Sequence, residues 1–285
     1  MIRSLIVLAL WAALPTPAQV GSAALYTNFE QTPAVPVVRA LQEEVDSLMA
    51  QSGLHFEWRS LPEQNFATWT DLAVVKFSGR CDVLPFAPNS QIDQRLGWTH
   101  LYSTDVLPFA EVDCDAVRAF INRQLLALPA QSRQKVLGRA LGRVVAHELL
   151  HIFARSTAHS DHGVDQPFLT VSDLMADHLD LSQKEAAIVR ASPAPSMQAR
   201  EGSPAVGKAS YEQAGCATCH GANGEGSRRG PALHFSDRGL NAIMLAAKLA
   251  KSQPKMCQRA RNLNVAPPSI SEDDLPDLVR FLSEH

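Results

Sequence analysis

A five-residue pattern, C-A-T-C-H at residues 216–220, constrains the fold and chemistry of this chain more than any other stretch. Cysteines spaced i and i+3 lie on one side of a helical turn, so the sulfur atoms of Cys216 and Cys219 face the same way. The pattern also fits half a zinc knuckle or a thioredoxin-type redox pair. A knuckle needs a second ligand pair, however, and a redox pair does not account for His220. The sequence therefore predicts one covalently bound haem c, held by Cys216 and Cys219, with His220 bound to the iron.

The first 23 residues have the pattern of a secretory signal peptide. Arg3 precedes an apolar run over residues 5–14 that is too short to span a bilayer. Small residues ending at Ala18 or at Ala23 offer alternative cleavage sites, and an uncleaved anchor is the competing interpretation. Because haem c is assembled outside the cytoplasm, export agrees with the haem motif. We expect a periplasmic or secreted protein that has no membrane span after cleavage.

Composition adds three constraints on the whole chain. Its 285 residues, 46% of them hydrophobic, provide material for two compact domains. A net charge of −3 gives no reason to expect nucleic-acid binding. In an exported protein the cysteines outside the haem motif favour a disulfide between Cys81 and Cys114. Cys257, beside Met256, is then expected to be a small buried residue.

A stretch rich in proline and serine at residues 192–205 predicts a linker. It separates an N-terminal domain at residues 24–191 from a C-terminal domain at residues 206–285. We expect each domain to have its own independent core.

Residues 206–285 resemble class I cytochrome c. The resemblance rests on an apparent helix before the haem motif, a glycine-rich stretch after it, the sequence G-P-A-L at 230–233, and a last amphipathic helix that Ser271 would cap. It implies an all-α monohaem domain whose first and last helices cross, and which exchanges electrons with a redox partner protein. It also implies that the Pro231 carbonyl accepts the imidazole N–H of His220.

The resemblance leaves three candidates for the second axial ligand of the iron. We favour Met256, because it follows Pro254, expected to break a helix, in the region where the distal methionine of the family lies. Met244 falls within an apolar helical stretch at residues 240–250, where methionine is more often a core residue. His234 follows the G-P-A-L sequence on the proximal side and should not reach the distal face.

The second informative pattern is H-E-L-L-H at residues 147–151. Histidines at i and i+4 project from one face of a helix, so His147 and His151 can bind one Zn²⁺ together, while Glu148 can polarise a metal-bound water. The apolar periodicity of the preceding residues predicts this helix, and Gly138 and Gly142 would let another element pack closely against it. The competing interpretation is two buried helix histidines without a metal.

Zinc needs a third protein ligand. The metzincin spacing fails here, and the acidic candidates later in the chain are Asp173 and Asp177. The segment instead resembles small secreted bacterial zincin-like proteins, in which a seven-residue gap and a third histidine follow H-E-x-x-H. That resemblance implies His159 as the ligand, with His162 as the alternative.

The remaining N-terminal chain predicts an α+β domain with the architecture of a minimal zincin. The expected helices are 36–52, 115–128 and 131–155, and the expected strands are 54–58, 73–77, 97–102 and 106–112. We therefore predict an exported cytochrome fused to a zinc metallopeptidase that acts on peptides, with Glu148 as general base. The alternative is a non-catalytic docking module, with structural zinc or none, that presents the cytochrome to its redox partner.

Overall fold

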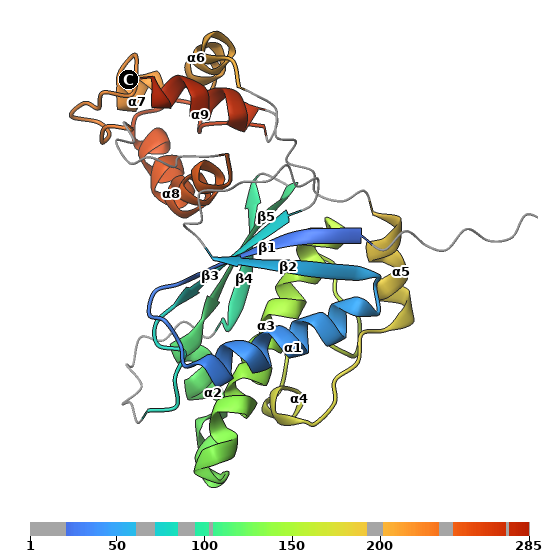
Figure 1. Ribbon diagram of the computed structural model, residues 1–285. Coiled ribbons are helices and arrows are strands. Elements are labelled where there is room, and N and C mark those ends of the chain that lie inside the picture. The colour runs from blue at the N-terminus through green and yellow to red at the C-terminus, as the bar shows by residue number, and fades with distance from the viewer. Residues whose placement is uncertain are drawn as a thin grey trace, which may run out of the picture.

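The computed structural model describes residues 21–60, 72–84, 95–102, 105–192, 202–233, 242–271 and 274–284. Within these ranges the chain forms an N-terminal domain with a mixed sheet and a C-terminal domain made of helices (Figure 1). Most of the expected signal peptide and linker, together with His234, lies outside the described residues. None of the helices in the described ranges combines the length and the apolar character needed to cross a bilayer.

Five strands form one sheet with the order β2-β1-β3-β5-β4. Their bounds are β1 Gly21–Phe29, β2 Leu54–Ser60, β3 Leu72–Ser78, β4 Gly97–Tyr102 and β5 Asp105–Asp113. β1, β2, β3 and β5 run parallel, whereas β4 lies antiparallel to β5 at the edge. The four predicted strands are confirmed. β1 was missed, because its small apolar residues also fit the end of a signal peptide.

Both faces of the sheet are apolar. Successive side chains of a strand point to opposite faces, and in β1 Ala23 and Leu25 belong to one buried cluster while Ala24 and Tyr26 belong to another. β3 and β5 alternate in the same way. Near-continuous apolar runs of this kind are typical of strands that are covered on both sides.

Helices of the N-terminal domain cover the first face. They are α1 Val35–Ala50, α2 Cys114–Ala127, α3 Ala130–Ala154, α4 Val171–Met175 and α5 Gln183–Ala191. α1 and α3 pack closely, as the two glycines predicted. The approach is so close that a Cβ atom on Gly138 of α3 would collide with the carbonyl oxygen of Val37 on α1. Glu44 of α1 accepts a 2.6 Å hydrogen bond from the buried guanidinium of Arg143 on α3.

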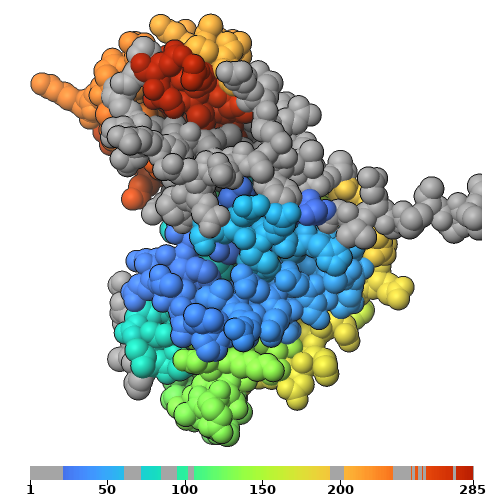
Figure 2. Space-filling model, viewed as in Figure 1, coloured from blue at the N-terminus to red at the C-terminus, as the bar shows by residue number. Residues whose placement is uncertain are grey.

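The second face is covered by the C-terminal domain, whose helices are α6 Pro204–Gln213, α7 Ala217–His220, α8 Ala242–Asn262 and α9 Leu275–Ser283. One hydrophobic cluster joins the two domains. Its buried members are Ala24, Tyr26, Leu72, Val74, Leu107 and Phe109 from the sheet, with Tyr211, Leu245, Leu275, Leu278, Phe281 and Leu282 from the helices. α8 contacts β4 and β5, and Figure 2 shows the C-terminal residues at one end of the molecule. The expectation of two independent cores is therefore wrong.

The first and last helices of the C-terminal domain cross closely. A Cβ atom on Gly207 of α6 would collide with the carbonyl oxygen of Asp277 on α9. Near the crossing, the rings of Tyr211 and Phe281 lie 5.3 Å apart between centroids. α9 begins later than predicted, with Asp274 rather than Ser271 as its N-cap, although the Ser271 N–H donates to the Asp274 carboxylate at 3.0 Å.

α8 corrects a second expectation. Pro254 does not end a helix, because α8 runs through it from Ala242 to Asn262. A proline inside a helix removes one backbone hydrogen bond. Packing of the apolar face, which includes buried Leu245 and Ala260 on either side of Pro254, offsets that loss.

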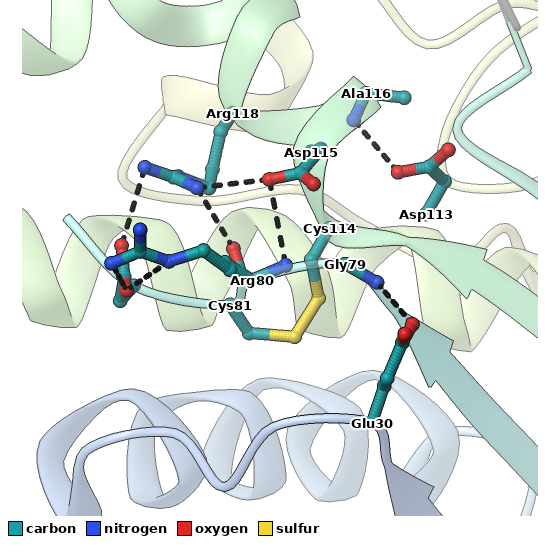
Figure 3. Close-up of a disulfide and its surroundings, with 10 residues drawn as sticks. Glu30, Gly79, Arg80, Cys81, Asp113, Cys114, Asp115, Ala116 and Arg118 are labelled. Atoms are coloured by element: carbon teal, nitrogen blue, oxygen red, sulfur yellow. Dashed lines mark hydrogen bonds and ion pairs between the residues drawn. A yellow bond between two sulfur atoms is a disulfide. The ribbon is translucent and has the colours of Figure 1, made fainter. Parts of the chain in front are cut away.

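The predicted disulfide between Cys81 and Cys114 is confirmed, with the two Cα atoms 4.9 Å apart (Figure 3). It joins the chain after β3 to the first residue of α2. Beside it, the buried guanidinium of Arg118 donates to the Asp115 carboxylate at 2.9 Å and to the Arg80 carbonyl oxygen at 3.1 Å. The disulfide and this network together fix α2 to the end of β3.

We expect the double substitution Cys81→Ser and Cys114→Ser to lower the free energy of unfolding by about 2–5 kcal/mol, because the bridge restricts the unfolded chain. Urea unfolding followed by circular dichroism measures the change. Cys257→Ser is the matched control and should change stability little, since Cys257 forms no disulfide. A peptide map of the exported protein that shows free thiols at both positions would contradict the bridge.

Candidate metal centres

The H-E-L-L-H residues lie near the C-terminal end of α3, which packs against β4 and β5. His147 and His151 are one helical turn apart, and their Nε2 atoms are 3.2 Å from each other. Glu148 is buried beside them. The i, i+4 spacing thus brings both imidazoles together as the sequence predicted.

Backbone carbonyls fix the orientation of both rings. Nδ1 of His147 lies 2.9 Å from the Val164 oxygen, and Nδ1 of His151 lies 2.8 Å from the Ser156 oxygen. A carbonyl oxygen only accepts hydrogen bonds, so each Nδ1 must carry the hydrogen. In a neutral ring the two Nε2 atoms are then left with free lone pairs, which is the arrangement metal-binding histidines adopt.

Burial keeps these rings neutral. It lowers the pKa of His147 to about 4, against the opposing effect of the Val164 carbonyl, and neighbouring His151 and His159 lower it further. Burial likewise lowers the pKa of His151. Both imidazoles can therefore donate a lone pair to a metal ion at neutral pH without first losing a proton.

His159 completes a group of three. α3 ends at Ala154, and its C-cap Arg155, with a left-handed backbone (φ 50°), turns the chain back toward the helix. The His159 ring centroid then lies 5.2 Å from that of His147 and 4.7 Å from that of His151. The ligand atoms of the three histidines lie within 4.8 Å of one another, and His162 is not part of this group.

Glu148 points at β4 rather than joining the histidine group. The Thr99 hydroxyl donates to its carboxylate at 2.7 Å, and a Cβ atom on Gly97 would lie 3.0 Å from its Oε1. Burial raises the pKa of Glu148 to about 7, while the Thr99 hydrogen bond opposes that shift. No local pattern indicates the contact of Thr99 with Glu148, because only the packing of β4 on α3 places the two side chains together.

The donor set fits a zinc ion. Three neutral imidazole nitrogens are a usual set for Zn²⁺. Three protein ligands also leave one coordination position open, which distinguishes a catalytic zinc site from a closed structural one. Asp173 and Asp177 have other partners, Thr170 and Arg139 respectively.

The C-A-T-C-H residues form a single helical turn. The Cys216 carbonyl oxygen accepts hydrogen bonds from the N–H groups of Cys219 at 3.1 Å and His220 at 2.9 Å. Burial raises the pKa of the Cys216 thiol to about 11. Thioredoxin-type pairs depend on a lowered thiol pKa, so this environment disfavours the redox-pair interpretation.

The proximal histidine is oriented as the resemblance implied. Nδ1 of His220 lies 2.7 Å from the Pro231 carbonyl oxygen, which confirms that expectation. Gly230 lies against the same ring, since a Cβ atom there would sit 3.0 Å from the imidazole and 2.8 Å from the Cys219 oxygen. Nε2 of His220 is thereby left as the iron ligand, and these residues fit a covalently attached haem.

Residues 204–285 match the family model described as Cytochrome c. The C-terminal segment is a cytochrome c domain. The family implies covalent haem c and electron transfer, in agreement with the geometry of Cys216, Cys219 and His220. No curated protein and no solved structure matches this chain.

The two methionine candidates lie on the same helix of the cytochrome c domain. Met256 is half-buried in α8, and one turn later Arg259 donates to the Arg228 carbonyl oxygen in the loop after the haem motif, at 3.4 Å. Met244 lies twelve residues earlier, which corresponds to about 18 Å along a straight helix. The two therefore cannot serve interchangeably. Pro254 does not break the helix and so no longer favours Met256, but the contact of Arg259 with the loop after the haem motif does, and Met256 stays our prediction for the distal ligand.

Purified full-length protein should retain haem on a denaturing gel, because thioether bonds survive unfolding. Staining for haem peroxidase activity measures this. The double substitution Cys216→Ala and Cys219→Ala should abolish the stained band, whereas Cys257→Ala should keep it. Haem that dissociates from the wild type under denaturing conditions would rule out covalent attachment.

Ferric Met256→Leu should lose the sulfur-to-iron charge-transfer band, and its reduction potential should fall, because a thioether ligand favours reduced iron. Met244→Leu is the matched control and should preserve the spectrum and the potential. Visible spectroscopy and potentiometric titration measure both properties. The opposite result would assign the axial position to Met244.

Proposed function

We propose that this protein is an exported electron-transfer cytochrome whose N-terminal domain is a zinc-dependent peptidase. In this proposal His147, His151 and His159 bind the zinc ion and Glu148 is the general base. The observation that carries it is the group of three histidines whose ligand atoms lie within 4.8 Å of one another. The carbonyl-oriented Nδ1 atoms of His147 and His151 support it, because they direct both Nε2 atoms to one point.

The position of Glu148 supports a catalytic rather than a structural zinc site. Bound zinc would supply Lewis-acid activation of water. Glu148 is buried next to the histidines but is not one of the grouped ligands. Its pKa of about 7 suits a carboxylate that accepts a proton from the attacking water and returns it to the leaving amine. Thr99 holds the carboxylate in place for both transfers.

The antiparallel strand β4 offers a place for a peptide substrate. Among the described strands β4 pairs only with β5, so its other edge presents backbone groups beside the site. An extended peptide can add to such an edge through main-chain hydrogen bonds. Because Thr99 of β4 contacts Glu148, a peptide bound along this edge would pass close to the general base.

Export is part of the proposal, and the sheet favours one cleavage site. Gly21–Ala23, the last residues of the expected signal peptide, pair with Leu54–Phe56 as the start of β1. Ala23 is completely buried. Cleavage after Ala18 would leave β1 whole, whereas cleavage after Ala23 would remove paired residues. We therefore propose cleavage after Ala18 and a periplasmic or secreted protein.

The cluster shared by the two domains favours a second candidate function. Tyr26, Val74 and Phe109 of the sheet pack into the same core as Leu245, Leu278 and Phe281 of the cytochrome c domain. Such an interface suits a docking module that holds the cytochrome in a fixed orientation for a redox partner protein. In that case any zinc would serve the fold and the domain would cleave no peptide.

Two substitutions separate these functions. Glu148→Gln should retain zinc, because Glu148 is not a ligand, yet lower peptide cleavage by roughly 100-fold or more, because the general base is lost. His159→Ala should weaken zinc retention, and His162→Ala is its matched control, since His162 lies outside the histidine group. Metal analysis after dialysis and cleavage of a broad peptide library measure the two properties.

The haem spectrum should be unchanged in all three variants, because α3 and the cytochrome c domain cover opposite faces of the sheet. Wild-type protein that holds one zinc ion but cleaves no peptide would favour the docking module. Wild-type protein that binds no zinc would refute the metal site, and the haem and electron-transfer assignment would stand alone.

A further inference from the structure

The hydrophobic cluster between the two domains extends to the haem attachment turn. Cys216 and Ala217 of that turn are partly buried against the cluster, and so is Leu233, the last residue of the G-P-A-L sequence. The same cluster contains Tyr26 and Phe109 of the sheet, which are almost completely buried. A continuous apolar core therefore joins the residue that carries the haem to the sheet of the N-terminal domain.

The strands beneath this cluster also support the histidine group. On β5, Leu107 and Phe109 belong to the cluster shared with the cytochrome c domain, whereas Ala110 belongs to the cluster on the other face. α3, which bears the first two histidines of the group, packs on β5 and β4. The Thr99 hydroxyl of β4 donates to the Glu148 carboxylate. The same strands thus connect the shared cluster with the candidate zinc site.

The cytochrome c domain has little core that it does not share. Every leucine and aromatic residue that is buried in its described part belongs to the shared cluster. Its three cysteines form no disulfide in the described structure. Chains of roughly 80 residues rarely build a sufficient core alone and depend on a disulfide, a metal or another added constraint. Covalent haem, a large apolar ring, supplies that missing part here.

Loss of these helices would return one face of the sheet to water. The sheet side chains that they cover are all apolar or aromatic and all buried, namely Ala24, Tyr26, Leu72, Val74, Leu107 and Phe109. Exposure of such a contiguous apolar face is unfavourable. The stability of the sheet therefore depends on a neighbouring domain that itself depends on haem.

We propose that haem attachment at Cys216 and Cys219 controls the folding of the N-terminal domain. Each thiol adds its S–H across one haem vinyl group: a C–S bond forms, the hydrogen goes to the other vinyl carbon, and no oxidant or reductant is consumed. Before attachment the sheet lacks its second cover and the histidine group is not held in place. The consequence for peptide cleavage rests on the function proposed above, whereas the coupled folding of the two domains does not.

The first test compares two preparations of the full-length wild-type chain. One is exported with haem attached, and the other is exported from cells that lack the haem-attachment machinery, so no substitution separates them. Hydrogen exchange followed by mass spectrometry measures the protection of each strand. The haem-free chain should lose protection in β1, β3 and β5 by roughly 100-fold or more. Equal protection of these strands in both preparations would overturn the proposal.

The second test uses only haem-loaded protein, so it stands even if the haem-free chain is degraded. Every tryptophan of the sequence lies at or before Trp98. Tryptophan fluorescence therefore reports on the N-terminal domain, whereas the Soret absorbance of the haem reports on the cytochrome c domain. Both probes should give the same Tm, because a shared core unfolds as one unit. Two separate values of Tm would contradict the coupling.

A substitution in the cytochrome c domain should also be felt across the interface. Leu278→Ala on α9 removes a buried side chain of the shared cluster, and the fluorescence-monitored Tm should fall by roughly 5–15 °C. Val206→Ala on α6 is the matched control and should change Tm little, because Val206 is exposed. A Leu278→Ala variant in which only the Soret-monitored Tm falls would show that the domains unfold independently.

Zinc content and peptide cleavage are measured on both preparations of the wild type. If haem-loaded protein holds no zinc, the peptidase proposal fails, while hydrogen exchange and the two values of Tm still decide the coupling. If the haem-free chain keeps the protection of its strands, its zinc and its cleavage activity, the coupling fails and the peptidase proposal stands. The two failures are therefore separate results.

Discussion

The fold depends on a sheet with two apolar faces, each of which must be removed from water. The alternation in β1 sends Ala23 and Leu25 to one side and Ala24 and Tyr26 to the other. Helices α1, α2 and α3 cover the first side, and the cytochrome c domain covers the second. An uncovered face of this kind would be an aggregation hazard. The C-terminal domain is therefore part of the structure that stabilises the sheet and not only a module attached by a linker.

The face of the sheet that the cytochrome c domain covers also contains a buried charged residue, Glu111. Glu111 follows Leu107 and Phe109 along β5 on the same side of the sheet and is almost fully buried. His100 lies 3.2 Å and Lys76 lies 3.3 Å from its carboxylate. Burial raises the pKa of Glu111, but these two partners outweigh it and lower the pKa overall. Such a fully paired carboxylate fixes the register of three neighbouring strands without leaving an unpaired charge.

The histidine group depends on backbone as much as on side chains. The left-handed turn at Arg155 ends α3 and sends the chain back to supply His159. The same loop provides the Ser156 and Val164 carbonyl oxygens that orient His151 and His147. One segment thus supplies a ligand and positions the other two. Two of the three histidines lie on α3, which packs on the face of the sheet opposite the cytochrome c domain, so the sheet lies between the two candidate metal centres.

The sequence by itself determined the elements whose signals are local. The pattern C-A-T-C-H predicted the haem attachment turn, H-E-L-L-H predicted two histidines on one helix face, and apolar periodicity predicted four of the strands. Each is set by neighbours a few residues apart, which a linear pattern records directly. By contrast, the sequence left His159 and His162 as alternative ligands. The course of the chain after α3 depends on the left-handed turn at Arg155, which no linear pattern records.

Only the tertiary structure decided features that depend on distant segments. The contact between Thr99 and Glu148 and the burial of Phe109 and Leu278 in one hydrophobic cluster join residues far apart in the chain. Local pattern was also misleading for β1, whose small apolar residues fit a signal peptide as well as a buried strand. For Pro254, packing along α8 overrode the local preference to end a helix. Burial of apolar surface acts over the whole molecule, so its outcome cannot be read from spacing alone.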